Sequence, residues 1–315
     1  MNKTIEPAYL NLLQNGILED RISTALRHLD SCDLCPRRCG VNRNAGEIGG
    51  CRIGKLALVC SYFPHLGEEN PIRGWSGSGT IFFGGCNLSC QFCQNFDISQ
   101  SASGVESTPE EIAEIMLSLQ EKGCHNINLV SPSHVVAQIM SAVLIAAQNG
   151  LRLPLVYNTG GYDDLTALRL LDGVIDIYMP DMKYSSPTLA GKYSGAHDYP
   201  RINQTAVLEM YRQVGDLQID SDGLAYRGLL VRHLVLPQDI AGTKQIVAFL
   251  AEKVSRKTYI NIMPQYHPAY HANRYPELNR PITAQEYASA VQSAWKVGLS
   301  RLDDLSCYLD TNNNL

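Results

Sequence analysis

The strongest constraint on how this chain folds is a regular alternation of strand-like and helix-like segments that begins at Ser78. Helical patterns separate short apolar segments, and the capping-box pairs Thr108 with Glu111 and Thr283 with Glu286 mark two helix starts. Strands are expected at residues 80–83, 127–130, 153–157, 174–179, 228–236 and 259–263. Six β/α repeats in a row predict a parallel sheet with helices outside it, either open and doubly wound or curled into a partial barrel. In both arrangements the catalytic groups belong at the C-terminal ends of the strands.

Charge and hydropathy exclude several classes of partner. The formal net charge of the 315 residues is -5, so the chain has no general basic field to hold a phosphate backbone, and nucleic acid is not an expected partner. No apolar run reaches the length of about 18 residues that a membrane-spanning helix needs, and no membrane association is expected. The first residues have neither an apolar h-region nor a small-residue cleavage site, so the expected location is the cytoplasm.

The cysteines divide the chain into regions. Eight of the ten cysteines lie between positions 32 and 93. Clustered cysteines in a protein without an export signal more often bind metal or perform redox chemistry than form disulfides. Residues 1–75 do not follow the β/α alternation and are expected to form a Cys-rich cap, followed by a β/α core at 76–300 and a tail at 301–315.

Directly after the first strand, Cys86, Cys90 and Cys93 have the spacing C-x3-C-x2-C. Three thiolates on a [4Fe-4S] cluster leave one iron open, as a catalytic metal requires. The amino and carboxylate groups of S-adenosylmethionine (SAM) can chelate that iron, and an electron from the reduced cluster can then cleave SAM to methionine and a 5′-deoxyadenosyl radical. Phe92 stands where it could pack against the adenine. The alternative is a zinc site completed from elsewhere, but a position after the first strand of a β/α series favours the radical SAM interpretation.

The stretch GSGTIFFGGCNLSCQFCQN resembles pyruvate formate-lyase activating enzymes, and SCDLCPRRCGVNRNAGEIGGCRIG is similar to the front of a less characterised, PflX-like branch of the same superfamily. The resemblance extends from about residue 31 to about residue 290. It implies a partial (β/α)6 TIM-like barrel of the radical SAM type, SAM as co-substrate and an oxygen-sensitive, oxidoreductase-like activity. A flavodoxin- or ferredoxin-like electron donor is the partner that such chemistry requires. The resemblance suggests a glycine of a glycyl-radical enzyme as the target, while a small molecule or another peptide side chain stays open. The rival function is a non-catalytic zinc or iron–sulfur module that binds a protein partner.

Two strand ends carry residues that match the activating enzymes. Asp181 and Lys183 match a D-x-K motif near SAM, and their alternation places both on one side of the chain, either as functional groups or as a surface ion pair. Asn158 ends the preceding strand where the related turn has an acidic residue, so the cation held there in the family is in doubt.

The other strand ends supply three further candidates for SAM binding. Ser131 follows the second strand where related proteins have a Gly-Gly-Glu-Pro-like segment, although a helix N-cap serine is an equally good interpretation. Arg232 matches a strand arginine that could hold the SAM carboxylate, provided that it and not His233 faces inward. His267 matches a histidine that contacts SAM in those enzymes.

A second set of thiols lies in the cap. Four cysteines close either a tetrahedral zinc site or a [4Fe-4S] cluster without leaving a coordination position open. The set consists of Cys32, Cys35, Cys39 and Cys51. The interleaved arginines could offset the negative charge of either centre, and the residues do not decide between zinc, iron and free structural thiols. This site is not expected to cleave SAM.

Overall fold

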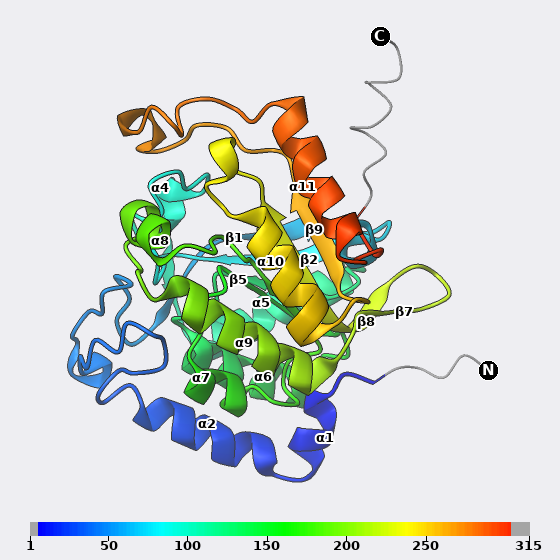
Figure 1. Cartoon of the computed structure of the whole chain (residues 1–315). Coiled ribbons are helices and arrows are strands. Elements are labelled where there is room, and N and C mark those ends of the chain that lie inside the picture. Colours follow the sequence, from blue (N-terminus) through cyan, green and yellow to red (C-terminus); the bar gives the residue numbers. More distant parts are fainter. Residues whose placement is uncertain (1–5, 304–315) are drawn as a thin grey trace.

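The computed structural model describes residues 6–303 and has the parallel series that the sequence predicts. Its strands are β2 (Ser78–Phe83), β4 (Ile127–Val130), β5 (Leu155–Thr159), β6 (Ile177–Pro180), β8 (Ala225–Leu234) and β9 (Tyr259–Met263). Each pairs in parallel with the next (Figure 1). β6 begins three residues later than expected because the amides of Val174 and Ile175 donate to the carbonyl of Leu171 and so close the preceding helix.

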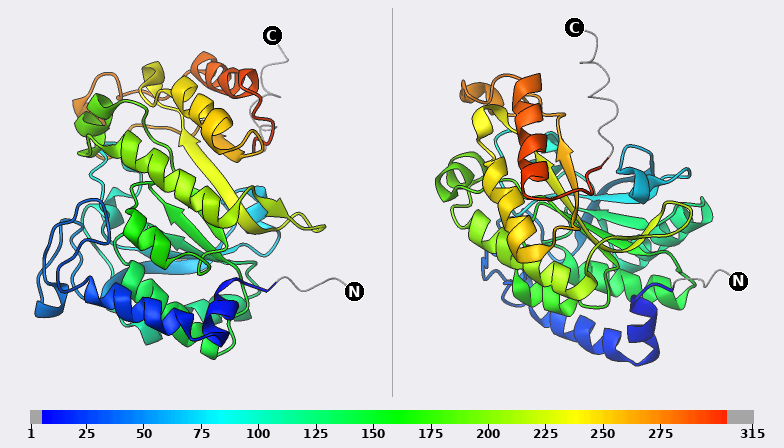
Figure 2. Two further views of the ribbon diagram at one scale, coloured as in Figure 1. Left: turned by 60° about the horizontal axis from the view of Figure 1, so that its bottom comes forward. Right: turned by 45° about the vertical axis from the view of Figure 1, so that its right-hand side comes forward.

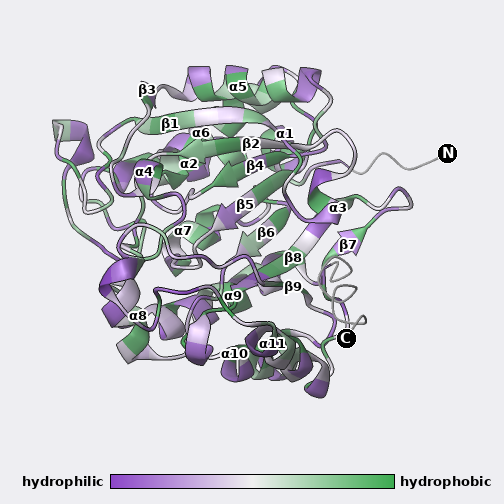
Figure 3. Cartoon of the chain, turned by 90° about the horizontal axis from the view of Figure 1, so that it is seen from above, coloured by the Kyte–Doolittle hydropathy of each residue, from purple (hydrophilic) through white to green (hydrophobic). Residues whose placement is uncertain are grey.

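The sheet curls into a partial barrel. Viewed from above, its strands follow one another in an arc from β1 to β9 (Figure 3). At one edge, β1 (Ala57–His65) pairs antiparallel with β2, and β3 (Val105–Ser107) pairs with β1. At the other edge, β8 pairs with β9 and with the short antiparallel β7 (Gln218–Ile219). Residues 57–65, which the sequence assigns to the cap, therefore extend the sheet of the core.

Helices cover the outside of the sheet. They are α5 (Pro109–Glu121), α6 (Val136–Gln148), α7 (Leu165–Leu170), α9 (Tyr199–Val214), α10 (Thr243–Phe249) and α11 (Ala284–Lys296). Both predicted capping boxes are present, at the starts of α5 and α11. Three further helices lie in the connections: α3 (Asn70–Arg73), α4 (Phe96–Ser99) and α8 (Pro187–Ser194).

The N-terminal region wraps around this layer. Helices α1 (Tyr9–Gln14) and α2 (Ile17–Arg27) run across the outside of α6, and α2 also contacts α7 (Figures 1 and 2). The Cys-rich loops follow α2. Residues 1–5 of the expected cap and 304–315 of the expected tail lie outside the described residues. Within 6–303, no helix combines the length and the apolar character needed to cross a membrane.

Three apolar clusters surround the site. The largest one fills the space between the sheet and the outer helices. Another lies on the inner side of the strands, where Val156, Ile177 and Leu230 pack with Ile72 of α3. The third includes Phe92 and therefore reaches the cysteine loop.

Candidate active site

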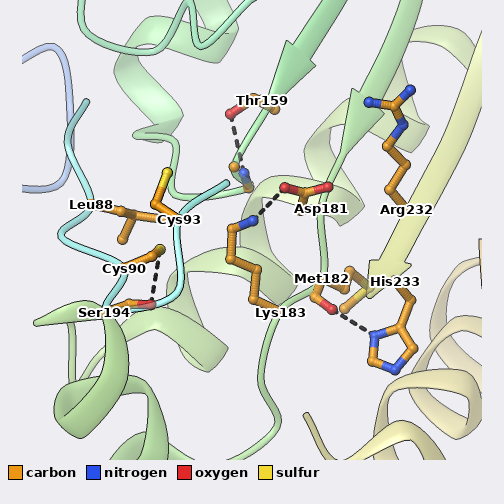
Figure 4. A network of polar contacts seen from close by, with 12 residues as sticks. Leu88, Cys90, Cys93, Thr159, Asp181, Met182, Lys183, Ser194, Arg232 and His233 are labelled. Carbon is orange, nitrogen blue, oxygen red and sulfur yellow. Dashed lines mark hydrogen bonds and ion pairs between the residues drawn. The ribbon is translucent and has the colours of Figure 1, made fainter. Parts of the chain in front are cut away.

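A cavity of about 480 Å³ lies where the cysteine loop faces the strand ends. Its lining includes all three cysteines of the C-x3-C-x2-C motif, together with Asp181, Lys183 and Arg232. Figure 4 shows Lys183 between the cysteine loop and Asp181. The structure thus brings together residues that are up to 146 positions apart in the chain.

Each cysteine of the loop has a polar neighbour at its sulfur. The Sγ of Cys86 accepts a hydrogen bond from the amide of Leu88 at 3.3 Å, and the Sγ of Cys90 accepts one from the hydroxyl of Ser194 at 3.0 Å. The Sγ of Cys93 lies 3.2 Å from the hydroxyl of Ser99. Such donors favour the thiolate form that binds metal.

The loop itself is held by its surroundings. The side-chain amide of Asn87 donates to the carbonyl of Tyr162 at 2.7 Å, and the backbone amide of Gln91 donates to the carbonyl of Tyr193 at 2.7 Å. Gly85 has φ +75°, and a Cβ there would lie 2.4 Å from the carbonyl oxygen of Cys51, so only glycine fits. Three thiols on one fixed loop, each with a polar donor, fit a cluster that has three protein ligands and an open iron.

Asp181 and Lys183 form an ion pair inside this cavity and not on the outer surface. Their side chains are 22% and 20% exposed. Burial alone would lower the pKa of Lys183, but the charges of Asp181 and of the Cys90 thiolate raise it above its ordinary value. The carbonyl of Asp181 accepts hydrogen bonds from the hydroxyl of Tyr199 at 3.0 Å and from the side-chain amide of Asn203 at 2.9 Å. Tyr199 and Asn203 therefore fix the backbone of the pair, while the ammonium group of Lys183 lies on the side of the cysteine loop (Figure 4).

Arg232 points into the cavity, whereas His233 faces α10. The ring of His233 lies 2.7 Å from the carbonyl of Met182 and 2.9 Å from the hydroxyl of Thr243. The guanidinium of Arg232 donates to Glu68, to Glu69 and, at 3.4 Å, to the side-chain oxygen of Asn158.

Glu68 and Glu69 are site residues that the sequence did not reveal. They precede α3 in the region assigned to the cap, and both carboxylates are almost completely buried at the floor of the cavity. Glu68 also accepts a hydrogen bond from Asn128 at 3.0 Å, and Glu69 accepts one from Asn261 at 2.8 Å. Burial would raise the pKa of Glu68, but Arg232 and His65 lower it to about 2. Two adjacent acids before a proline carry no signal that they enter a barrel.

At the second strand end the structure contradicts the N-cap interpretation of Ser131, whereas contact of Ser131 with SAM stays a prediction. Ser131 lines the cavity with φ +60°, and the hydroxyl of Ser133 lies 2.9 Å from that of Thr159. The N-cap of α6 is Val135, which makes no side-chain capping bond, so neither serine caps the helix.

Two further candidates lie around the cysteine loop. Phe92 is buried at the cavity wall, with edge-on ring contacts to Tyr184 and Tyr266. His267 is exposed at the rim, where its Nδ1 is 3.2 Å from the side-chain nitrogen of Gln94. Contact with SAM stays a prediction for both.

The four cap cysteines lie in the loops after α2, around the side chain of Arg43. Among residues 6–303, no three His, Cys, Asp or Glu side chains are already spaced to hold a single metal ion. That result covers the cap cysteines and the cysteines of the cavity alike.

Comparison with known proteins identifies the family. The model of the radical SAM superfamily matches residues 80–230, which include the cysteine loop and β2 to most of β8. Uncharacterized protein MJ0674 of Methanocaldococcus jannaschii is 30% identical over 305 residues, which cover 94% of this chain and 83% of the relative. The chain belongs to the radical SAM superfamily. Membership implies a [4Fe-4S] cluster and SAM, and the cavity has the donor set that they require. A second relative of this radical SAM protein, uncharacterized protein MJ0808 of the same organism, is 25% identical over 82% of the chain and 76% of its own length.

A solved structure of low sequence identity has a similar fold. The FeFe-hydrogenase maturase HydG from Carboxydothermus hydrogenoformans aligns with a TM-score of 0.50 and 12% identity, over 93% of this chain and 69% of its own. The structure described as native anSMEcpe with bound AdoMet aligns with a TM-score of 0.47 and 12% identity, over 68% of this chain. This chain spans 57% of that protein's length.

Proposed function

We propose that this radical SAM protein cleaves SAM at a cluster held by Cys86, Cys90 and Cys93 and abstracts a hydrogen atom from a substrate in the adjoining cavity. The observation that carries the proposal is that the three thiols share one cavity with the Asp181–Lys183 ion pair. When bound, the cluster supplies the electron that converts SAM to methionine and the hydrogen-abstracting 5′-deoxyadenosyl group.

The residues of the chain have the tasks of binding and orienting. Lys183 carries its positive charge beside Cys90, where it stabilises thiolate charge and can hold a carboxylate. Asp181 keeps the ammonium group in place and is itself fixed through its carbonyl by Tyr199 and Asn203. Polar groups that converge in the cavity and are covered by a ligand have to be partnered by ligand groups, since burial without a partner costs several kcal/mol.

The proposed target is a C–H bond of a polypeptide partner, such as a glycine of a glycyl-radical enzyme. The resemblance to pyruvate formate-lyase activating enzymes motivates this choice, as do apolar side chains beside the cavity. Phe63 is exposed and stacks on Phe82 of the cavity lining, and Leu66 is exposed between the lining residues His65 and Gly67. Large exposed apolar side chains close together are typical of protein interaction sites. The proposed electron donor is a flavodoxin- or ferredoxin-like protein, and membership of the activating-enzyme branch is part of the same proposal.

Anaerobic reconstitution followed by reduction with dithionite tests the function. Cys86→Ala, Cys90→Ala and Cys93→Ala are each expected to abolish formation of 5′-deoxyadenosine while the β/α core still folds. Cys124→Ala is the matched control, because this thiol is also buried but lies outside the cavity lining. Wild-type rates in any of the three loop variants would overturn the proposal. Absence of iron–sulfur absorption in the wild-type protein would favour the non-catalytic zinc module.

A further inference from the structure

The cap contains a buried positive charge with no carboxylate beside it. Arg43 is 1% exposed. Its Nη1 donates to the carbonyl of His134 at 2.8 Å, its Nη2 donates to the Sγ of Cys51 at 3.2 Å, and its Nε has no hydrogen-bond partner. No acidic group within residues 6–303 forms an ion pair with it. A buried charge is strongly unfavourable unless a counter-charge accompanies it, so an anion is required near Arg43.

The cap cysteines surround this guanidinium. Besides its hydrogen bond to Cys51, Arg43 is close enough for its charge to act on Cys32, Cys35 and Cys39. Gly49 marks how tightly the groups converge. A Cβ there would lie 3.3 Å from the Sγ of Cys39, 3.4 Å from the Sγ of Cys51 and 3.5 Å from the Nη2 of Arg43.

The cap thiols are buried together in a loop that is closed by its own backbone. Cys32, Cys35 and Cys51 are 2%, 4% and 3% exposed. The amide of Cys32 donates to the carbonyl of Val41 at 2.9 Å, and the amide of Gly40 donates to the carbonyl of Cys32 at 2.9 Å. A fixed loop that gathers buried thiols around a cation suits a metal centre, because metal binding takes the thiols in their deprotonated form.

We propose that Cys32, Cys35, Cys39 and Cys51 hold a fully coordinated metal–thiolate centre whose negative charge is balanced by Arg43. Four thiolates around a zinc ion or a [4Fe-4S]²⁺ cluster both leave a net charge of about -2, which supplies the anion that the buried guanidinium requires. Binding of zinc, or of a preassembled [4Fe-4S]²⁺ cluster, releases the thiol protons without a change of oxidation state. The protein occupies all coordination positions of the centre, so SAM cannot bind to it and its role is structural.

The centre also braces the loop of the cavity. The ring of His134, whose carbonyl binds Arg43, lies 2.8 Å from the carbonyl of Gly84. Arg37 donates from Nε to the carbonyl of Asn87 at 2.7 Å. Both contacts reach the residues that flank Cys86. We therefore expect loss of the cap metal to loosen the cysteine loop of the cavity.

The test uses the full chain with Cys86, Cys90 and Cys93 all changed to alanine, so that the cap is measured without the cluster of the cavity. After anaerobic reconstitution, elemental and sulfide analysis is expected to find about one zinc, or about four irons with matching sulfide, per chain. Zinc gives no visible absorption, whereas an iron–sulfur cluster does. Adding Cys35→Ala or Cys51→Ala should remove the metal, and adding Cys124→Ala should not. A folded, soluble triple variant with neither metal would overturn the proposal, whatever the activity of the wild-type enzyme.

The role of Arg43 has its own measurement. Arg43→Met is expected to speed extraction of the cap metal by a chelator about tenfold or more, whereas Arg52→Met, which changes an exposed arginine of the same region, should leave the rate unchanged. Equal rates in Arg43→Met and the wild type would refute the charge balance. If Arg43→Met does not fold, Arg43→Lys tests the same point, because it keeps the charge and should retain metal better than Arg43→Gln.

Discussion

The carboxylate of Glu69 accepts two hydrogen bonds from the guanidinium of Arg232, one from Nε and one from Nη2, each at 2.7 Å. This bidentate pair joins the segment before α3 to β8, and Glu68 binds the same guanidinium. The two glutamates lie outside the region that matches the radical SAM family model, which begins at residue 80. A segment outside the region that matches the family model therefore contributes buried carboxylates to the lining of the cavity.

Arg232→Met is expected to destabilise the fold more than Glu69→Gln. Without the guanidinium, the buried carboxylate of Glu69 loses its counter-charge and that of Glu68 keeps only the ring of His65, and breaking a buried pair in this way typically costs about 3–5 kcal/mol. Glu69→Gln leaves Arg232 its bond to Glu68 and should cost about 1–3 kcal/mol. Urea denaturation at neutral pH measures both. Equal losses would show that the two carboxylates do not depend on the shared guanidinium.

The ion pair between Glu68 and Arg232 predicts that the stability of the fold depends on pH. Arg232 and His65 hold the pKa of Glu68 at about 2, below its ordinary 4.5, although burial acts in the opposite direction. A depressed folded-state pKa stabilises the fold above pH 4.5 and loses that contribution as the pH falls toward 2. In Arg232→Met the freed carboxylates can protonate, so the stability difference from wild type should shrink from neutral pH to about pH 4. A difference that stays constant would contradict this.

The buried carboxylate of Asp176 predicts a pH dependence of stability opposite in sign to that of Glu68. The Asp176 carboxylate accepts hydrogen bonds from the amides of Ala8 at 2.8 Å and Leu155 at 2.9 Å. Burial outweighs these bonds and raises the pKa from 3.8 to about 6. The folded state then binds the proton more tightly than the unfolded state, and this contribution to stability falls as the pH rises between those values. Asp176→Asn should make the free energy of unfolding less dependent on pH in that window. It should also cost about 1–3 kcal/mol at neutral pH, because one amide oxygen faces two donors.

The sequence predicts the parallel series and the cysteine loop because both depend on local patterns. Apolar runs, capping boxes and thiol spacing are read within a few neighbouring residues, and the six strands and both capping boxes are confirmed. The sequence does not predict strand β1, because its second half is largely exposed and shows no clean alternation of apolar and polar residues. It does not predict Glu68 and Glu69 as site residues, because their burial depends on Arg232, which lies more than 160 positions away.

Gly161→Ala is expected to disturb the position of Asp181 as well as the stability of the fold. Gly161 has φ +74°, and a Cβ there would lie 2.1 Å from the carbonyl oxygen of Asp181 and 2.3 Å from the side-chain nitrogen of Asn203. The side-chain amide of Asn203 donates to the carbonyls of Gly161 and Asp181. The added methyl group therefore has to push these groups apart, and they are the contacts that fix Asp181 behind the cavity. The left-handed backbone alone costs about 1–2 kcal/mol for alanine, and overpacking typically adds about 1–3 kcal/mol.

Gly123→Ala is the matched control for this prediction. Gly123 has a similar φ of +82°, but a Cβ there would meet no atom within 4 Å, so only the backbone cost remains. Urea denaturation should therefore give a loss of about 1–2 kcal/mol for Gly123→Ala and a clearly larger one for Gly161→Ala. Reductive SAM cleavage, assayed under conditions in which both variants are folded, should fall only in Gly161→Ala, because only there does the carbonyl of Asp181 have to move. Equal losses of stability in the two variants, with unchanged cleavage, would mean that the junction of Gly161, Asn203 and Asp181 yields without effect on the cavity.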